Sequence, residues 1–203
     1  MLRLAALCLI LVGCAARPAP EPSSEALIVV FADSFHSGIV LERSQVDRRL
    51  LPPAQAPWVA VHFGERRWIS GEADGLGDAM RLVVWPGEGG VQVDGIDWWI
   101  HDRGGTEPAL ERVWVFTVSQ QQLDRLRARL DSWIAIGATS HQIRPSTVWW
   151  PSSRAWSLRT NCHDFTVDLL AAAGIEVDQP PFMLAAPLRD ALDRAWSALD
   201  NGR

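Results

Sequence analysis

Residues 157–177, SLRTNCHDFTVDLLAAAGIEV, decide the fold expected for this 203-residue chain, because they combine helix signals with a cysteine. Asn161 is a favoured N-cap residue, Asp164 follows three positions later, and Gly174 is a natural C-terminal stop. The pattern therefore predicts a helix that begins at Cys162 and runs to Gly174, with the cysteine in its first turn.

The side chain of Cys162 is expected to face the protein. At about 100° per residue, the apolar side chains of the helix share its side, whereas Asp164 and Asp168 point away. A helix N-terminus carries roughly half a positive charge and free N–H groups, which lower a thiol pKa and can hold an oxyanion. Cys162 is thus a candidate nucleophile, with a small core residue as the alternative. His163 lies too far around the helix to be its base and is expected at the rim.

The chain starts with MLRLAALCLILVGC, an Arg followed by an apolar run and a cysteine. The run over residues 4–13 is shorter than the ~20 residues of a spanning helix and is typical of a secretory signal. Residues 11–14, Leu-Val-Gly-Cys, resemble the lipobox of bacterial lipoproteins. This resemblance implies a signal peptide over residues 1–13, a lipidated Cys14 with a flexible tether over residues 14–25, and an envelope location facing the periplasm. An ordinary cleaved signal or an uncleaved anchor is the alternative.

Composition narrows the chemistry of the mature protein. If Cys8 is removed and Cys14 is lipidated, Cys162 is a single leftover thiol, which is intermolecular, buried or reactive. All 19 basic residues are Arg, and the absence of Lys and Tyr excludes Schiff-base, Ser-Lys and Walker-type chemistry. A net charge of −5 without a basic block argues against a nucleic-acid partner. The Cys and His residues lack the paired spacing that is typical of metal ligands, so no metal site is expected. No cofactor is expected either.

Hydrophobic periodicity predicts one domain over residues 26–203. Strands are predicted at residues 26–32, 36–41, 58–63, 67–70, 80–85 and 112–118, with a hairpin turn at residues 64–66. Helical segments are predicted at residues 44–51, 119–134, 162–174 and 186–196, with Ser119 as an N-cap. Residues 70–80 and 139–160 predict loops, the second of them near a site.

Two motifs together resemble the circularly permuted branch of the NlpC/papain-like superfamily. They are Asn-Cys-His-Asp-Phe at residues 161–165 and His-Ser-Gly-Ile-Val-Leu at residues 36–41. The first is similar to the Asn-Cys motif of lecithin–retinol acyltransferase-like proteins. With Phe-Gly-Glu at residues 63–65, the set is more similar to an uncharacterised bacterial family, the urease-region conserved hypothetical proteins. Phe165 departs from the Trp of that family, and the turn is shorter than its Gly-Trp-Gly-acid turn. The resemblance implies an α+β, circularly permuted papain-like (NlpC-type) fold, with a central antiparallel sheet packed on the Cys-bearing helix.

The same resemblance implies a cysteine hydrolase that acts by acyl transfer, with Cys162 as nucleophile and His36 as base. The residue that orients His36 stays open between Glu65, which the family turn favours, and His62, because retinol acyltransferase relatives use a second His. The expected substrate is an amide in peptidoglycan stem peptides. Lipid or acyl-ester chemistry and a non-catalytic envelope binding module are the alternatives. Candidate groove residues are Asn161, the pair Trp149 and Trp150, and the pair Trp98 and Trp99, although large aromatics also fill cores.

Overall fold

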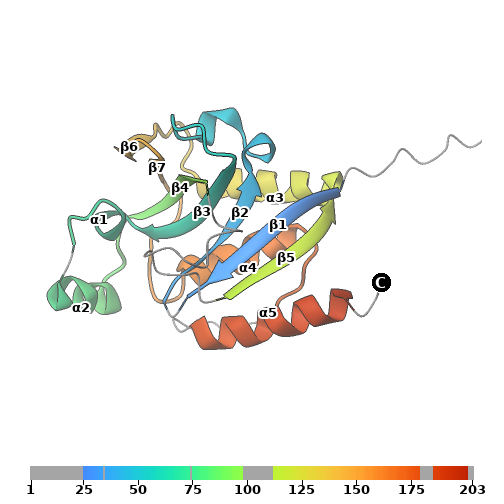
Figure 1. Ribbon diagram of the computed structural model, residues 1–203. Coiled ribbons are helices and arrows are strands. Elements are labelled where there is room, and N and C mark those ends of the chain that lie inside the picture. Colours follow the sequence, from blue (N-terminus) through green and yellow to red (C-terminus); the bar gives the residue numbers. More distant parts are fainter. Residues whose placement is uncertain (1–24, 34, 74, 98–111, 179–184, 201–203) are drawn as a thin grey trace, which may run out of the picture.

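A computed structural model of the chain describes residues 25–33, 35–73, 75–97, 112–178 and 185–200, and its centre is a seven-stranded sheet (Figure 1). All neighbouring strands are antiparallel, in the order β5-β1-β2-β3-β4-β7-β6. The strands are β1 (Glu25–Ala32), β2 (Ser37–Glu42), β3 (Trp58–Glu65), β4 (Gly89–Ile96), β5 (Arg112–Ser119), β6 (His141–Arg144) and β7 (Thr147–Pro151).

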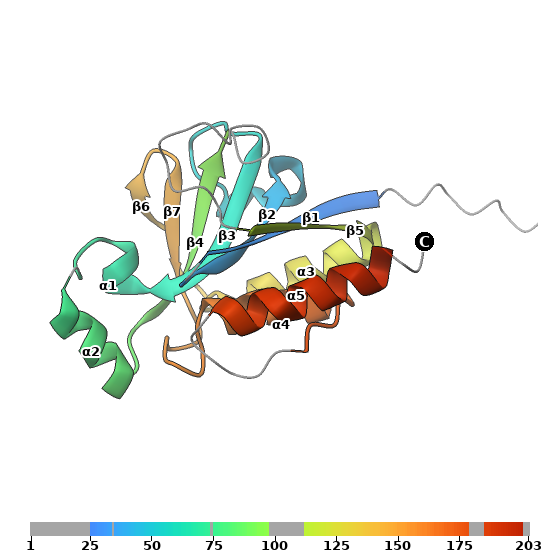
Figure 2. The same ribbon diagram turned by 60° about the horizontal axis from the view of Figure 1, so that its bottom comes forward.

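Three helices cover one face of the sheet, and two short helices project beyond one end of it (Figure 2). The covering helices are α3 (Gln120–Trp133), α4 (Cys162–Ala172) and α5 (Ala185–Asp200). The projecting helices are α1 (Arg66–Ile69) and α2 (Leu76–Val84). Residues 44–51, predicted as helical turns, contain most of one 3-10 turn, η1 (Arg43–Gln45), and all of a second, η2 (Arg48–Leu50). The predicted α+β architecture, with an antiparallel sheet against the Cys-bearing helix, is therefore confirmed.

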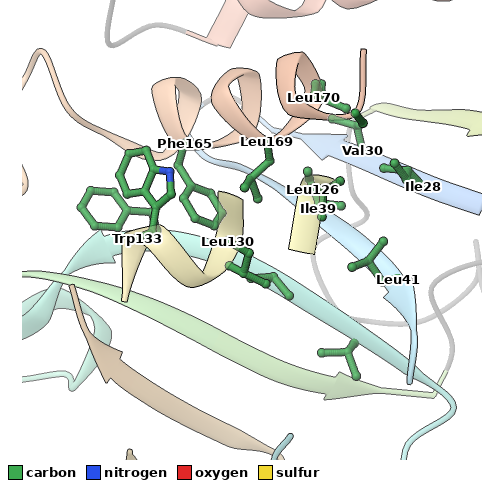
Figure 3. Close-up of a cluster of buried hydrophobic side chains, with 14 of the residues drawn as sticks. Ile28, Val30, Ile39, Leu41, Leu126, Leu130, Trp133, Phe165, Leu169 and Leu170 are labelled. Carbon is green, nitrogen blue, oxygen red and sulfur yellow. The ribbon is translucent and has the colours of Figure 1, made fainter. Parts of the chain in front are cut away.

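The main core lies between the sheet and helices α3 and α4 (Figure 3). Alternate side chains of β1 and β2 point into it, because successive residues of a strand face opposite sides. The central contributions are Ile28 and Val30 from β1, Ile39 and Leu41 from β2, Leu126, Leu130 and Trp133 from α3, and Phe165, Leu169 and Leu170 from α4. Each is at most 2% exposed, so each contributes roughly 1.5–3 kcal/mol by leaving water. This burial fixes α4, and with it Cys162, against the sheet.

The helix ends follow the predicted capping residues. Ser119 Oγ accepts a hydrogen bond from Gln122 N at 3.4 Å, and the Gln122 side chain accepts one from Ser119 N at 2.9 Å. This reciprocal pair starts α3 where predicted. Helix α4 ends at Ala172, and Gly174 then adopts a φ of 77°, which a residue without a Cβ tolerates.

Two predicted strands are helices instead. Residues 80–85 fall largely within α2, because Met80 and Leu82 continue a helix that starts at Leu76 and the β-branched residues come only in its last turn. Residues 67–70 fall largely in α1 and do not form the return strand of a hairpin. The Glu65 carboxylate accepts a hydrogen bond from Trp68 N at 3.2 Å, so it caps a helix at the position predicted to turn.

Three strands were not predicted. Strand β4 contains three glycines and two polar side chains, which conceal the alternation of Val91 and Val93. Strands β6 and β7 lie within residues 139–160, which the sequence predicts to be a loop. Long-range pairing between β4 and β7 stabilises these segments, and no local pattern reports such pairing.

Candidate active site

Cys162 is the first residue of α4, as predicted, because Asn161 caps the helix. The Asn161 side-chain oxygen accepts hydrogen bonds from His163 N at 2.8 Å and Asp164 N at 3.4 Å. Asp164 accepts one in return from Asn161 N at 3.1 Å. These bonds satisfy donors that a helix start otherwise leaves open. The thiol is free and 7% exposed.

The pKa of the Cys162 thiol is not lowered in the protein without substrate. Burial raises its pKa to about 11 from an ordinary 9.0, although backbone hydrogen bonds around it act in the other direction. Its sulfur lies 3.8 Å from the Phe35 carbonyl oxygen and 3.8 Å from His163 Nδ1. The prediction of a lowered pKa is therefore wrong, because loss of water outweighs the helix N-terminus. At pH 7 the thiol is neutral.

Three side chains form a hydrogen-bonded chain across the sheet: His36, His62 and Asp94. His36 directly precedes β2, where Asp33 Oδ1 accepts a hydrogen bond from His36 N at 2.6 Å. Antiparallel pairing of β2 with β3 places His62 opposite Gly38. His36 Nε2 lies 2.7 Å from His62 Nδ1, and His62 Nε2 lies 2.6 Å from Asp94 Oδ2. The base predicted from the sequence thus has a histidine partner and, behind it, a carboxylate.

The Asp94 carboxylate fixes the tautomers of both rings. Burial by itself would raise the pKa of Asp94, but hydrogen bonds led by that from His62 hold it below its ordinary value. His62 therefore donates its Nε2–H to the carboxylate and accepts the Nε2–H of His36 at its Nδ1. Burial, with the nearby His62 ring, also holds the pKa of His36 well below its ordinary value. His36 is thus neutral, with Nδ1 as a proton acceptor.

Cys162 and His36 line one cavity of about 450 Å³, beside α1 and α2. That volume lies within the range of small-molecule sites, roughly 300–1,000 Å³. Within the described part of the chain, the sulfur makes no hydrogen bond to the His36 ring, so proton transfer needs a closer approach when substrate binds. The apolar lining residues are Phe35, Phe63, Trp68, Ile69, Ala79, Leu82, Val83, Trp156 and Leu158, and the other lining residues are Gly64, Glu65 and Gln92.

His163 is buried, not at the rim where the sequence analysis places it. Its Nδ1 lies 2.9 Å from Ser37 Oγ, on the strand that follows His36, so α4 packs this ring against β2. Ser37 Oγ also lies 3.2 Å from the Cys162 carbonyl oxygen and 3.0 Å from Thr166 Oγ1. Ser37 is fully buried and directly follows His36 in sequence. These contacts fix the first turn of α4 relative to His36.

Glu65 lines the cavity but holds other partners. Its carboxylate forms an ion pair with Arg81 Nη2 at 3.0 Å and caps α1 through Trp68 N. In the described residues the ring of His36 is hydrogen-bonded to His62, so the second alternative, not Glu65, lies beside the predicted base. Glu65 instead connects β3 to α1 and α2, which form one wall of the cavity.

The candidate groove residues do not line this cavity. Trp149 and Trp150 lie on β7, an inner strand, and are 5% and 9% exposed. Trp150 belongs to the main core, as the alternative reading held, and Trp149 lines a different cavity. Asn161 is the helix cap described above. Residues 98–99, the other Trp pair, lie outside the described residues.

Asp94 is the site residue that the sequence analysis missed. Strand β4 alternates buried Val91 and Val93 with Gln92 and Asp94, and this alternation was the available signal. Gln92 Nε2 donates to Asp94 Oδ2 at 2.7 Å, and Thr147 Oγ1 donates to Asp94 Oδ1 at 2.5 Å. Both bonds orient the carboxylate toward His62.

The predicted signal, with Cys8, Cys14 and most of the tether, lies outside the described residues. Among those that are described, no helix is long and apolar enough to cross a bilayer. In the same residues no group of three or more His, Cys, Asp and Glu side chains is arranged to hold a metal ion. Comparison with family models, curated proteins and solved structures found no match for this chain.

Proposed function

We propose that this protein is a cysteine-dependent acyl-transfer enzyme, with Cys162 as nucleophile and His36 as general base. The observation that carries the proposal is the Asp94–His62–His36 chain, which leaves His36 with a free proton-accepting nitrogen on a ring that lines the same cavity as Cys162. A cysteine that only filled the core would need no such chain. A His before an early strand and a Cys on a late helix also support a permuted papain-like fold.

The reaction starts from a neutral thiol and a neutral imidazole. His36 Nδ1 takes the thiol proton as Sγ attacks the substrate carbonyl, and the Asp94 carboxylate stabilises the positive charge through His62. The Cys162 backbone N–H, in the first turn of α4, is available to hold the oxyanion. His36 then gives the proton to the leaving group, which leaves a thioester on Sγ. Water or another acceptor, deprotonated by His36, releases the acyl group and restores the thiol.

The cavity lining supports an apolar acyl group as the part of the substrate bound there. Most of the lining is aromatic or aliphatic, and its one carboxylate, Glu65, is already paired with Arg81. Peptidoglycan stem peptides, the substrate expected from the sequence, carry carboxylates, and the described lining contains no Arg to bind them. An acyl ester or a fatty amide therefore fits this lining better than a stem peptide does. Anchoring through Cys14 would place the enzyme at an envelope membrane, where acyl esters are abundant.

The test uses the full-length protein in parallel with phospholipid vesicles and with purified muropeptides, with products identified by mass spectrometry. We expect lysophospholipid or an acylated acceptor. Cys162→Ala should abolish the product, and His36→Ala should lower the rate by about 10²–10⁴-fold, as for a general base. Ile136→Ala, at a fully exposed position outside the cavity lining, is the matched control and should be fully active.

Each other outcome has a defined meaning. A cut muropeptide amide with intact lipid would keep acyl transfer but refute the apolar substrate. Binding of either substrate without turnover would favour the binding-module alternative. Product formation that survives Cys162→Ala would refute the nucleophile.

A further inference from the structure

The outward face of α2 is apolar. Leu76, Met80, Val83 and Val84 follow the spacing i, i+4, i+7 and i+8, so they share one side of the helix, and they are 81%, 56%, 49% and 62% exposed. Trp85, which follows the helix, is 67% exposed. A surface helix of a water-soluble domain normally presents polar side chains outward. The four helix side chains and the adjacent Trp85 are here called the α2 patch, and exposed apolar side chains gathered in this way mark an interaction site.

The α2 patch is continuous with the cavity that Cys162 lines. Val83 belongs to both, and Ala79 and Leu82 line the cavity from the other side of the same helix. Phe35 and Trp68 also line the cavity while being 79% and 40% exposed, so they lie at its mouth. Helices α1 and α2 project from one end of the sheet, away from the layer of α3, α4 and α5 (Figure 2). The mouth and the patch therefore lie at the same end of the molecule.

The charged groups near the patch are paired with one another. Arg67 Nη1 lies 2.7 Å from Asp78 Oδ1, and Arg81 Nη2 lies 3.0 Å from Glu65 Oε1. Arg66 bridges carboxylates on either side of α2, at residues 72 and 88, with distances of 2.7 and 2.8 Å. The rim is thus polar but close to neutral, and it offers no charge pattern that would select a charged protein partner.

We propose that the α2 patch inserts into the interface of a lipid bilayer and holds the mouth of the cavity against it. Exposed Leu, Met, Val and Trp side chains are of the kind that an interfacial helix buries at the boundary between headgroups and acyl chains. A second copy of this chain is a poorer occupant, because five side chains are few against the ~20–30 residues per side of a standard protein interface.

The chain that precedes Glu25 supports this occupant. Twenty-four residues lie ahead of β1, and ten of them, residues 15–24, separate Cys14 from Glu25. Ten residues reach at most about 35 Å, and a domain of this size is about 40 Å across. A lipid on Cys14 would therefore keep the domain at the membrane surface. Because the chain enters β1 at the end of the sheet opposite α2 (Figure 1), anchor and patch would contact the bilayer at two separate points.

The experiment places an environment-sensitive dye on the full-length protein in vesicles of phosphatidylethanolamine and phosphatidylglycerol. Met80→Cys carries the dye in a Cys162→Ser background, and Ile136→Cys, a fully exposed apolar position after α3, is the matched control. Lipids brominated on their acyl chains should quench the dye at Met80 and leave the dye at Ile136 unchanged. Adding Val84→Glu to the Met80→Cys protein should abolish the quenching, because a carboxylate on the same helix face resists burial in lipid.

Four results would overturn the proposal. Equal quenching at both positions would show that the dye itself enters the lipid. No quenching at Met80 would show that α2 stays in water. A dye at Met80 that is shielded only as protein concentration rises would assign the patch to a second copy. Full-length protein that fails to float with the vesicles would refute both the anchor and the patch. These readouts use the Cys162→Ser background, so they do not depend on acyl transfer.

Discussion

The rate at which Cys162 is alkylated should depend on pH in the way expected for a buried thiol that is neutral at pH 7. Its pKa of about 11 lies two units above the ordinary 9.0 because burial removes water from around the sulfur. At pH 8 the thiolate fraction is then about 10⁻³, against about 10⁻¹ for the ordinary value. Iodoacetamide, which reacts with the thiolate, should therefore modify Cys162 roughly 100-fold more slowly in the folded protein than after unfolding.

The assay follows carbamidomethylation of the Cys162 peptide by mass spectrometry, in the full-length protein, from pH 7 to pH 11. The rate should rise about tenfold per pH unit and should still be rising at pH 10. His36→Ala should change the rate at pH 8 by less than about twofold, because the thiol pKa is set mainly by burial. A midpoint of the alkylation rate below pH 9, or a large effect of His36→Ala, would refute this reasoning. Either result would indicate that Cys162 and His36 form a thiolate–imidazolium pair.

The raised pKa also has a consequence for stability. A group with a raised folded-state pKa stabilises the fold fully below its unfolded-state pKa, so this contribution is present below about pH 9 and is lost as pH rises toward 11. Two pKa units correspond to about 3 kcal/mol. Because the chain has neither Lys nor Tyr, few other groups titrate in this window. Urea unfolding at pH 8 and pH 10.5 should show the loss, and Cys162→Ser should reduce it.

Three substitutions test other parts of the account. Asp94→Asn should lower kcat by about 10²–10⁴-fold with the fold retained, because an amide no longer fixes the tautomers of the two rings. A fully active variant would show that the Asp94 carboxylate has no role in the reaction. Glu65→Gln should leave kcat unchanged but lower the free energy of unfolding by about 1–2 kcal/mol, because it weakens the ion pair with Arg81 and the cap of α1. A variant that is stable but inactive would show that Glu65 takes part in catalysis. Cys14→Ser should abolish metabolic labelling with palmitate, and unchanged labelling would contradict the lipid anchor.

Local signals were sufficient for the elements with strong periodicity and caps. The capping box at Asn161 and the leucines of α3 predicted two helices correctly, because caps and a 3.6-residue period act within one segment. Residues 80–85 were predicted wrongly because Val83 and Val84 suggest a strand, whereas the helix is set by residues that precede them. Strand β4 carries a short local signal, the alternation of Val91 and Val93 with polar residues, but its three glycines conceal it. The pairing of β4 with β3 and β7 is not visible in the sequence.

The sequence indicated individual candidate residues of the site, but not the contacts that they make with one another. Cys162 is predicted as a nucleophile from its position at the start of a helix, and His36 is predicted as its base through the family resemblance. His62 contacts His36 because the pairing of β2 with β3 places it opposite Gly38, whereas Glu65 is held by Arg81 and Trp68 N. The sequence alone indicates neither this register nor these partners. The thiol pKa was predicted in the wrong direction, because a sequence indicates a helix N-terminus but not the amount of water that packing removes.

The most direct test of the account is the covalent intermediate. Full-length protein is mixed with p-nitrophenyl palmitate and quenched in acid within the first turnover, and the intact mass and the modified peptide are then measured. We predict one acyl group per protein on Cys162 as a thioester, slower acylation in His36→Ala, and no thioester in Cys162→Ser. Release of product with no acyl group on Cys162, or an acyl group carried by another residue such as His163, would contradict it.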